Sequence, residues 1–203
     1  MPRDFLRQFS SSRIAVAFLL LIAGLLIYGT SLGNHFLLDD ESQVLQNRLV
    51  HSPANEGIFF LGSTMNQESN SSLGGIYYKP VMSLIYSLLW SVSPADSFPF
   101  HLFQLLLAVA NALLAFVFFR RFLSDLTAFF MALLFLVHPI NSEAVLYIAD
   151  LQDVLYTFFG LLALNLLAAG EALRWRHLAA MSALLLLSLL SKESGVLYLA
   201  TVL

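Results

Sequence analysis

Long apolar runs that lack Asp, Glu, Lys and Arg constrain this chain more than any other feature. They cover residues 14–32, 98–119, 126–140, 154–169 and 178–190, and another is still in progress at residue 203. A helix crosses a bilayer with about 20 apolar residues, and fewer suffice where the membrane is thin. With 59% hydrophobic and 11% charged residues, a soluble surface could not be covered. The sequence therefore predicts an all-α integral membrane protein, a polytopic helical bundle with five to six transmembrane helices.

The basic residues predict how these helices are oriented. Seven of the ten basic residues flank the apolar runs on one side of the membrane if the runs alternate in direction: Arg3, Arg7, Arg13, Arg120, Arg121, Arg174 and Arg176. Short loops rich in Lys and Arg stay in the cytoplasm. We therefore expect a cytoplasmic N-terminus. The first run has no small-x-small cleavage pattern before the acids that follow it, which favours a retained anchor over a signal peptide.

The segment between residues 33 and 97 is expected to be a large outer loop. Its stretch "PVMSLIYSLLWSVSP" between Pro80 and Pro94 is apolar but only about fifteen residues long. A crossing there would place Arg120 and Arg121 on the outer face, against the bias of the other basic residues. We expect an outer juxtamembrane helix at this position.

Polar groups gather on the predicted outer side. They are Asp39, Asp40, Glu41, Lys79, His101, His138, Asn141, Glu143, Asp150, Asp153, Lys192 and Glu193. Ionisable groups at membrane depth are costly and indicate function when they converge. Group transfer from a lipid-linked phosphate needs a carboxylate base near the acceptor hydroxyl and cations near the departing phosphate. Asp39 or Asp40 fits the first role. Lys79 and Lys192 fit the second.

Neighbouring residues on a helix diverge by about 100°, so Asp39 and Asp40 are not expected to face the same atom. One of them would act, and the other would orient or cap. Structural readings stand beside the functional ones. Lys79 would reach the interface beside Tyr78, and His138 and Glu143 would cap or begin a helix. Lys192 and Glu193 would form a local ion pair.

Six motifs in order carry a resemblance to a known family. They are "FLLDD", "YYKP", "FHLFQLLL", "ALLFLVHPINSEAV", "YIADLQDVL" and "LLSKESG". From residue 36 onward the chain resembles the GT-C-fold transmembrane O-mannosyltransferases that carry TPR repeats after the membrane domain, together with their bacterial relatives. The resemblance implies a GT-C-type bundle of which residues 1–203 are the N-terminal part. On this view the chain is truncated within a span, and the TPR region is absent.

The resemblance also implies an activity and a site. It implies inverting transfer of a sugar, often mannose, from a polyprenyl-phosphate-linked donor to a protein or glycan hydroxyl on the extracytoplasmic face. Asp39 and Asp40 are implied as the catalytic pair. The donor-phosphate and substrate-binding candidates are Tyr78, Lys79, His138, Glu143, Asp153, Lys192 and Glu193. Relatives often carry Asn, His and Arg where this chain has Gln104, Ala108 and Leu151.

Other functions are weighed against the transferase. A transporter or lipid-carrier protein would use buried acids and lysines to guide a charged substrate, with acids spread through the bilayer. Here the acids gather on one face, which favours the enzyme. An inactive fragment is a third reading. No cofactor is certain, a divalent metal is left open, and nothing resembles a nucleic-acid-binding patch. The lack of cysteine and the compact N-terminus favour a bacterial inner membrane.

Overall fold

The structure is a computed structural model that describes residues 13–61, 78–169 and 174–202. Within these ranges all regular elements are helical. The principal helices are α2 (Arg13–Tyr28), α4 (Pro80–Val92), α5 (Phe98–Phe119), α6 (Asp125–Val137), α7 (Ser142–Leu146), α8 (Leu151–Ala168), α9 (Trp175–Ser191) and α10 (Val196–Val202). Short helices connect them: η1 (Gly29–Gly33), η2 (Glu41–Leu45), η3 (Arg48–His51), η4 (Pro53–Asn55), α3 (Glu56–Phe59), η5 (Pro139–Asn141), η6 (Ile148–Asp150) and η7 (Glu193–Gly195).

Three helical segments of the described chain are long and apolar enough to cross a membrane: Arg13–Gly33, Phe98–Phe119 and Ile148–Ala168. The helices α6 and α7 form a fourth span if they are counted together across a bend of 49°. The predicted all-α membrane protein is thus confirmed. The expected fifth span, residues 178–190, lies in α9, an apolar helix of 17 residues that is shorter than the others.

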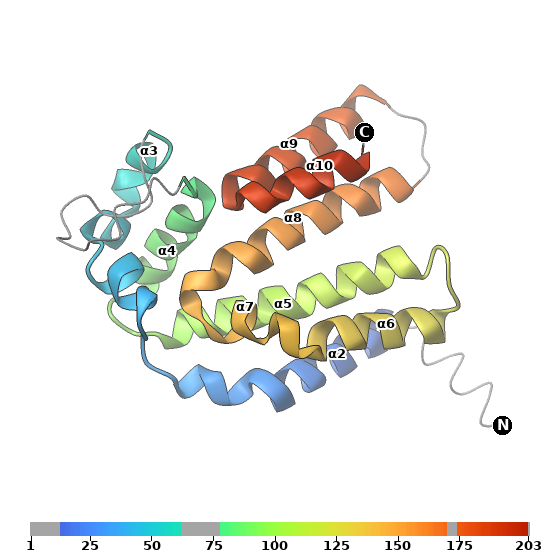
Figure 1. The fold of residues 1–203 in the computed structure, drawn as a ribbon, viewed down its shortest axis with the longest axis horizontal. Coiled ribbons are helices and arrows are strands. Elements are labelled where there is room, and N and C mark those ends of the chain that lie inside the picture. The colour runs from blue at the N-terminus through green and yellow to red at the C-terminus, as the bar shows by residue number, and fades with distance from the viewer. Residues whose placement is uncertain (1–12, 62–77, 170–173, 203) are drawn as a thin grey trace.

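The helices alternate in direction around α5, which packs against α2, α6 and α8 (Figure 1). The connections after α2, α7 and α9 lie at one end of the bundle, together with α3 and α4. The turn between α5 and α6 and the start of α9 lie at the other end. The Arg120–Arg121 pair and the Arg174–Trp175–Arg176 run therefore lie at the end opposite the acidic loop.

Small side chains and amides hold the spanning helices together. Ala108, Ala112 and Ala115 of α5 are buried, and small residues let helix backbones approach closely. Two amides then join α5 to α8. The Nδ2 of Asn111 donates to the carbonyl of Val154 (2.9 Å), and the Nδ2 of Asn165 donates to that of Leu114 (3.0 Å). Polar side chains inside apolar helices thus supply the contacts that hydrophobic burial cannot provide in lipid.

The predicted juxtamembrane helix is present as α4. Pro80 occupies its first position, where a missing N–H costs nothing, and the helix ends before Ser93. The Tyr86 hydroxyl donates to the carbonyl of Ile148 (2.7 Å), and His51 of η3 stacks on Trp90 with 3.7 Å between ring centroids. The helix α4 is therefore fixed both to η3 and to the segment just before α8. Its place on the outer side of a membrane stays a prediction.

Gly195 gives a test of how η7 packs against α9. A Cβ at this position would lie 2.6 Å from the carbonyl carbon of Ser188 and 2.7 Å from its oxygen, and backbone cannot move aside as a side-chain tip can. We expect Gly195→Ala to lower the free energy of unfolding by roughly 1–3 kcal/mol, measured as a lower thermal midpoint in detergent. Gly57→Ala is the matched control, because nothing lies within 4 Å of that position. Equal midpoints for the two variants would contradict this packing.

Candidate functional site

Asp40 is the buried member of the acidic pair, with 1% of its surface exposed. Its Oδ1 accepts a hydrogen bond from the backbone N–H of Ala149 (2.7 Å), and its Oδ2 accepts one from that of Leu37 (3.1 Å). Burial raises the pKa of Asp40 to about 6. The two backbone hydrogen bonds oppose this rise, and the charges of Asp150 and Asp39 add to it. The Asp40 carboxyl thus links the acidic loop to the start of α8.

Asp39 is exposed and differs from its neighbour in every contact. Its backbone N–H donates to the hydroxyl of Tyr147 (2.9 Å), and its side chain is exposed where that of Asp40 is buried. The turn that precedes it contains Leu38 at φ 49°, a left-handed conformation that is costly for a branched side chain and that recurs at functional sites. The structure therefore separates one buried carboxyl from one accessible carboxyl.

Residues 144–149, which contact both acids, are held in place by Gln104 of α5. This side chain is fully buried, and its Nε2 donates to the carbonyls of Ala144 and Tyr147, both at 2.7 Å. Carbonyls at the end of a short helix have no partner within that helix, so the amide satisfies groups that α7 leaves open. Gln104 is therefore a structural support beneath the acidic loop.

The two lysines lie in one electrostatic cluster with three acids, Asp150, Asp153 and Glu193. The Nζ of Lys192 donates to both carboxylate oxygens of Asp153, at 2.6 and 2.9 Å. Burial alone would lower the pKa of Lys192, but the hydrogen bond and charge of Asp153 outweigh it and raise the pKa. Lys79 is 9% exposed. Burial lowers its pKa, the charge of Glu193 opposes this, and the charge of Lys192 adds to the lowering.

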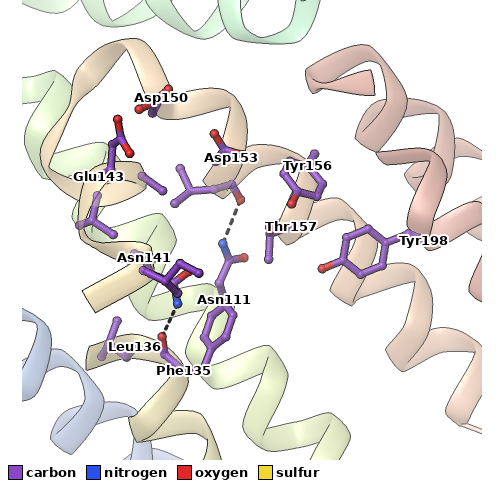
Figure 2. A pocket seen from close by; sticks show the side chains of 15 residues that line it. Asn111, Phe135, Leu136, Asn141, Glu143, Asp150, Asp153, Tyr156, Thr157 and Tyr198 are labelled. Carbon is purple, nitrogen blue, oxygen red and sulfur yellow. Dashed lines mark hydrogen bonds between the residues drawn. The ribbon is translucent and has the colours of Figure 1, made fainter. Parts of the chain in front are cut away.

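A cavity of about 390 Å³ lies beside this cluster (Figure 2). It is formed by α5, the α6–α7 bend, α8 and α10. The lining includes Asn111, Glu143, Asp150, Asp153, Tyr156 and Tyr198. Of the predicted site residues, Glu143 and Asp153 line this cavity directly, and Lys192 reaches it through Asp153.

His138 and Tyr78 are among the predicted residues that do not line this cavity. His138 is exposed at the α6–α7 bend, where its Nδ1 accepts a hydrogen bond from the backbone N–H of Ile140 (3.2 Å). It lines a second hollow of about 440 Å³. Tyr78 is 44% exposed, and its hydroxyl donates to the carbonyl of Phe60 (3.1 Å), on the side of α3. Their expected roles in binding stay predictions.

The structure adds residues that the predicted site did not contain. Asn111 and Gln104 lie within the apolar run 98–119, and Tyr147 stands between two short helices. A polar amide in the middle of a membrane span is itself a signal of a specific partner. In the described ranges, no group of three or more His, Asp or Glu side chains is arranged to hold a metal ion.

The pKa of Asp40 predicts how stability depends on pH. Folding raises it from 3.8 to about 6, so between these values the folded state binds a proton that the unfolded state has released. The free energy of unfolding should fall as the pH rises from about 4 to about 7, by about 3 kcal/mol for a shift of this size. Asp40→Asn should lack this slope.

The measurement compares thermal midpoints in detergent at pH 4.5 and pH 7.5. The wild-type protein should exceed Asp40→Asn by more at pH 4.5 than at pH 7.5. Asp39→Asn is the control, because it removes an exposed carboxyl next to the same turn. An identical wild-type advantage at the two pH values would show that Asp40 does not titrate in this way.

Comparison with known proteins finds similarity over most of the chain. It is 26% identical to "Protein O-mannosyl-transferase F38B6.6" of Caenorhabditis elegans over 88% of this chain and 26% of that protein. It is 26% identical to "Protein O-mannosyl-transferase TMTC3" of Homo sapiens, over 83% of this chain and 19% of that protein. For "Protein O-mannosyl-transferase TMTC1" of Homo sapiens the identity is 34%, over 72% and 17% respectively.

The chain spans about a quarter or less of the length of these relatives. No family model matches it, and no solved structure matches it. The resemblance expected from its motifs is nevertheless confirmed: over most of its length, this chain is similar to the protein O-mannosyl-transferases of the TMTC family.

Proposed function

We propose that this chain belongs to a membrane glycosyltransferase that moves a sugar, mannose by analogy with the names of its relatives, from a polyprenyl-phosphate-linked donor to a protein or glycan hydroxyl. One observation carries the proposal. The acidic loop, the cavity with its carboxylates and the two lysines adjoin one another at one end of the bundle. Glycosyl transfer from a phosphate needs these same groups.

The base in this mechanism is Asp39. Its exposed carboxylate takes the proton of the acceptor hydroxyl, and the acceptor oxygen bonds to the anomeric carbon from the face opposite the phosphate. The bond between the anomeric carbon and the phosphate oxygen breaks, and its electron pair stays on the phosphate. The configuration is therefore inverted. Asp40 is a positioning residue, because its hydrogen bonds to Leu37 and Ala149 hold the turn that presents Asp39.

Lys79 and Lys192 stabilise the departing phosphate. Both lie among carboxylates in a partly desolvated setting, where a cation interacts more strongly with developing negative charge. In this mechanism Asp153 orients Lys192, and Glu193 balances Lys79. Glu143 lines the cavity for substrate contact.

The second hollow offers a path for the lipid tail of such a donor. It measures about 440 Å³ and is lined mainly by apolar side chains of α5, α6 and the bend, with His138 at its polar edge. It shares Phe135, Ile140 and Asn141 with the carboxylate-lined cavity. An apolar channel that adjoins a polar cavity suits an amphiphilic molecule. Tyr78 would contact substrate only from the α3 side.

One observation favours a second candidate, a transporter or lipid carrier. The α6–α7 pair is bent by 49° at His138 and Pro139, and broken helices are typical of transporters. Among the described residues this is one such pair, whereas transporters built from repeats carry two in corresponding positions. The transferase accounts for more of the polar groups.

The proposed activity predicts a sharp difference within the acidic pair. Asp39→Asn should lower the rate of transfer by about 10²- to 10⁴-fold with little change in thermal midpoint, because it removes a base and no buried contact. Asp40→Asn should also lower the rate of transfer, because an amide oxygen and an NH2 group cannot accept both backbone hydrogen bonds that hold the turn. The assay follows labelled sugar from polyprenyl-phosphate mannose to a peptide, with the intact protein in membranes. Glu41→Gln is the control, since it alters the exposed acid next in sequence.

Full transfer by Asp39→Asn would exclude Asp39 as the base. Movement of labelled lipid-linked sugar across vesicles without any transfer would favour the carrier.

The proposed orientation places the acidic end outside the plasma membrane, which we take to be a bacterial inner membrane, and the arginine end in the cytoplasm. Because the chain has no cysteine, single cysteines report on topology without background. Ala54→Cys in η4 and Phe122→Cys after α5 are both exposed positions. An impermeant maleimide added to intact cells should label Ala54→Cys alone. Labelling of Phe122→Cys alone would reverse the orientation.

A further inference from the structure

Asn111 contains a buried polar atom that the described structure leaves unexplained. The residue is 2% exposed, and its Nδ2 donates to the carbonyl of Val154 (2.9 Å). Its Oδ1 has no hydrogen-bond partner among the described residues. Buried acceptors are almost always paired, with protein, water or a ligand. The Oδ1 of Asn111 therefore needs a hydrogen-bond partner that the described residues do not supply.

Asn111 lines the cavity of about 390 Å³. Figure 2 shows Asn111 projecting into it from α5, with Glu143, Asp150 and Asp153 on one side and Thr157 and Tyr198 on the other. A volume near 400 Å³ lies at the small end of the range for ligand sites, about 300–1,000 Å³. The cavity is therefore sized for a small molecule or one head group.

The lining of the cavity is rich in acceptors. One N–H of the Asn111 amide is used by Val154, and the Oδ1, which has no partner among the described residues, can only accept. The three carboxylates also accept when ionised. In the described ranges no three such groups converge on a metal position. The lining thus calls for a ligand with several spaced donors, and the hydroxyl groups of a sugar provide them.

Two further features favour a neutral sugar over a cationic ligand. Asp153 already pairs with Lys192 through both of its oxygens, which offsets part of the negative charge at the cavity wall. Tyr156 and Tyr198, with ring centroids 6.0 Å apart, add apolar ring surface to the wall. A pyranose ring has hydroxyls at its edge and C–H groups on its faces, and it matches such a mixed lining.

We propose that this cavity holds the hexose of the lipid-linked donor and that the Oδ1 of Asn111 accepts a hydrogen bond from one of its hydroxyls. The inference rests on the proposed function and extends it to sugar selection. A hexose in this cavity lies next to Asp153, so its phosphate falls beside Lys192. A sugar that lacks the hydroxyl facing Asn111 leaves that oxygen buried and unpaired, and sites of this kind reject such analogues strongly.

The test measures binding of polyprenyl-phosphate mannose to the intact purified protein, in competition with its 2-, 3-, 4- and 6-deoxy analogues. For the wild-type protein, one deoxy analogue should bind roughly tenfold or more weakly through loss of its bond to Asn111. In Asn111→Leu, the same analogue and the natural donor should bind equally. The comparison of deoxy analogues uses the wild-type protein alone, so it still tests the proposed site if Asn111→Leu folds poorly.

Asn165→Leu is the matched control. Asn165 also joins α8 to α5 through its Nδ2, and its Oδ1 is also buried without a partner among the described residues, but it does not line the cavity. This variant should keep the wild-type preference among the deoxy analogues. If both asparagines had a purely structural role, Asn111→Leu and Asn165→Leu would change the preference among the deoxy analogues to the same extent.

The outcomes separate the inference from the function on which it rests. Donor binding and transfer with equal affinity for all four analogues overturn the sugar site and leave the transferase standing. Discrimination that persists unchanged in Asn111→Leu overturns the role of Asn111. A protein that neither binds the donor nor transfers its sugar overturns both the site and the function.

Discussion

The hydrogen bond from Ala149 to the Asp40 carboxyl joins the two halves of the candidate site. It connects the loop after α2 to the start of α8 across 109 positions of sequence, and the bond from the Asp39 N–H to the Tyr147 hydroxyl reinforces the same connection. The bond is made at the cost of burying a carboxyl, whose pKa rises to about 6 in consequence. The buried Asp40 carboxyl weakens the fold near neutral pH, and its role is to fix the position of its exposed neighbour Asp39.

Amide side chains inside the bundle also join distant segments through hydrogen bonds to the backbone. Gln104 and Asn111 each use their nitrogen to satisfy backbone carbonyls of the segment around α7 and α8. In lipid such bonds contribute what hydrophobic burial does in water, although each is worth only about 1 kcal/mol. The carbonyl oxygens of both amides remain buried without partners in the described structure. Of the two residues, Asn111 lines the carboxylate-lined cavity and Gln104 does not. Gln104 is therefore a structural support, and Asn111 is a candidate for ligand contact.

Much of this architecture could be predicted from the sequence, because charge-free runs and arginine positions obey simple rules of membrane insertion. The ranges of α4 and α5 agree with the predicted helix near Pro80 and the predicted span 98–119. The break at His138 was harder to place. Pro139 predicts that a helix ends there, but not that α7 continues at 49°. The sequence could not predict that Asp40 is buried and Asp39 exposed. That contrast depends on the turn at Leu38 and on the hydrogen bond from Ala149, which is far away in sequence.

The position of Asp153 shows how the site combines opposite demands. Its carboxylate accepts hydrogen bonds from Lys192 with both oxygens, and Asp153 also lines the cavity together with Glu143 and Asp150. An ion pair with roughly a quarter of each side chain exposed adds little stability by itself. Its value lies in placement: it keeps a cation at the rim while the polar interior stays open to hydroxyls. The ammonium group of Lys192 has three N–H groups, and two of them bind Asp153, so one remains to donate to a phosphate while the ion pair stays intact. In the proposed complex the donor would then contact both members of this ion pair, with its phosphate at Lys192 and its sugar at Asp153.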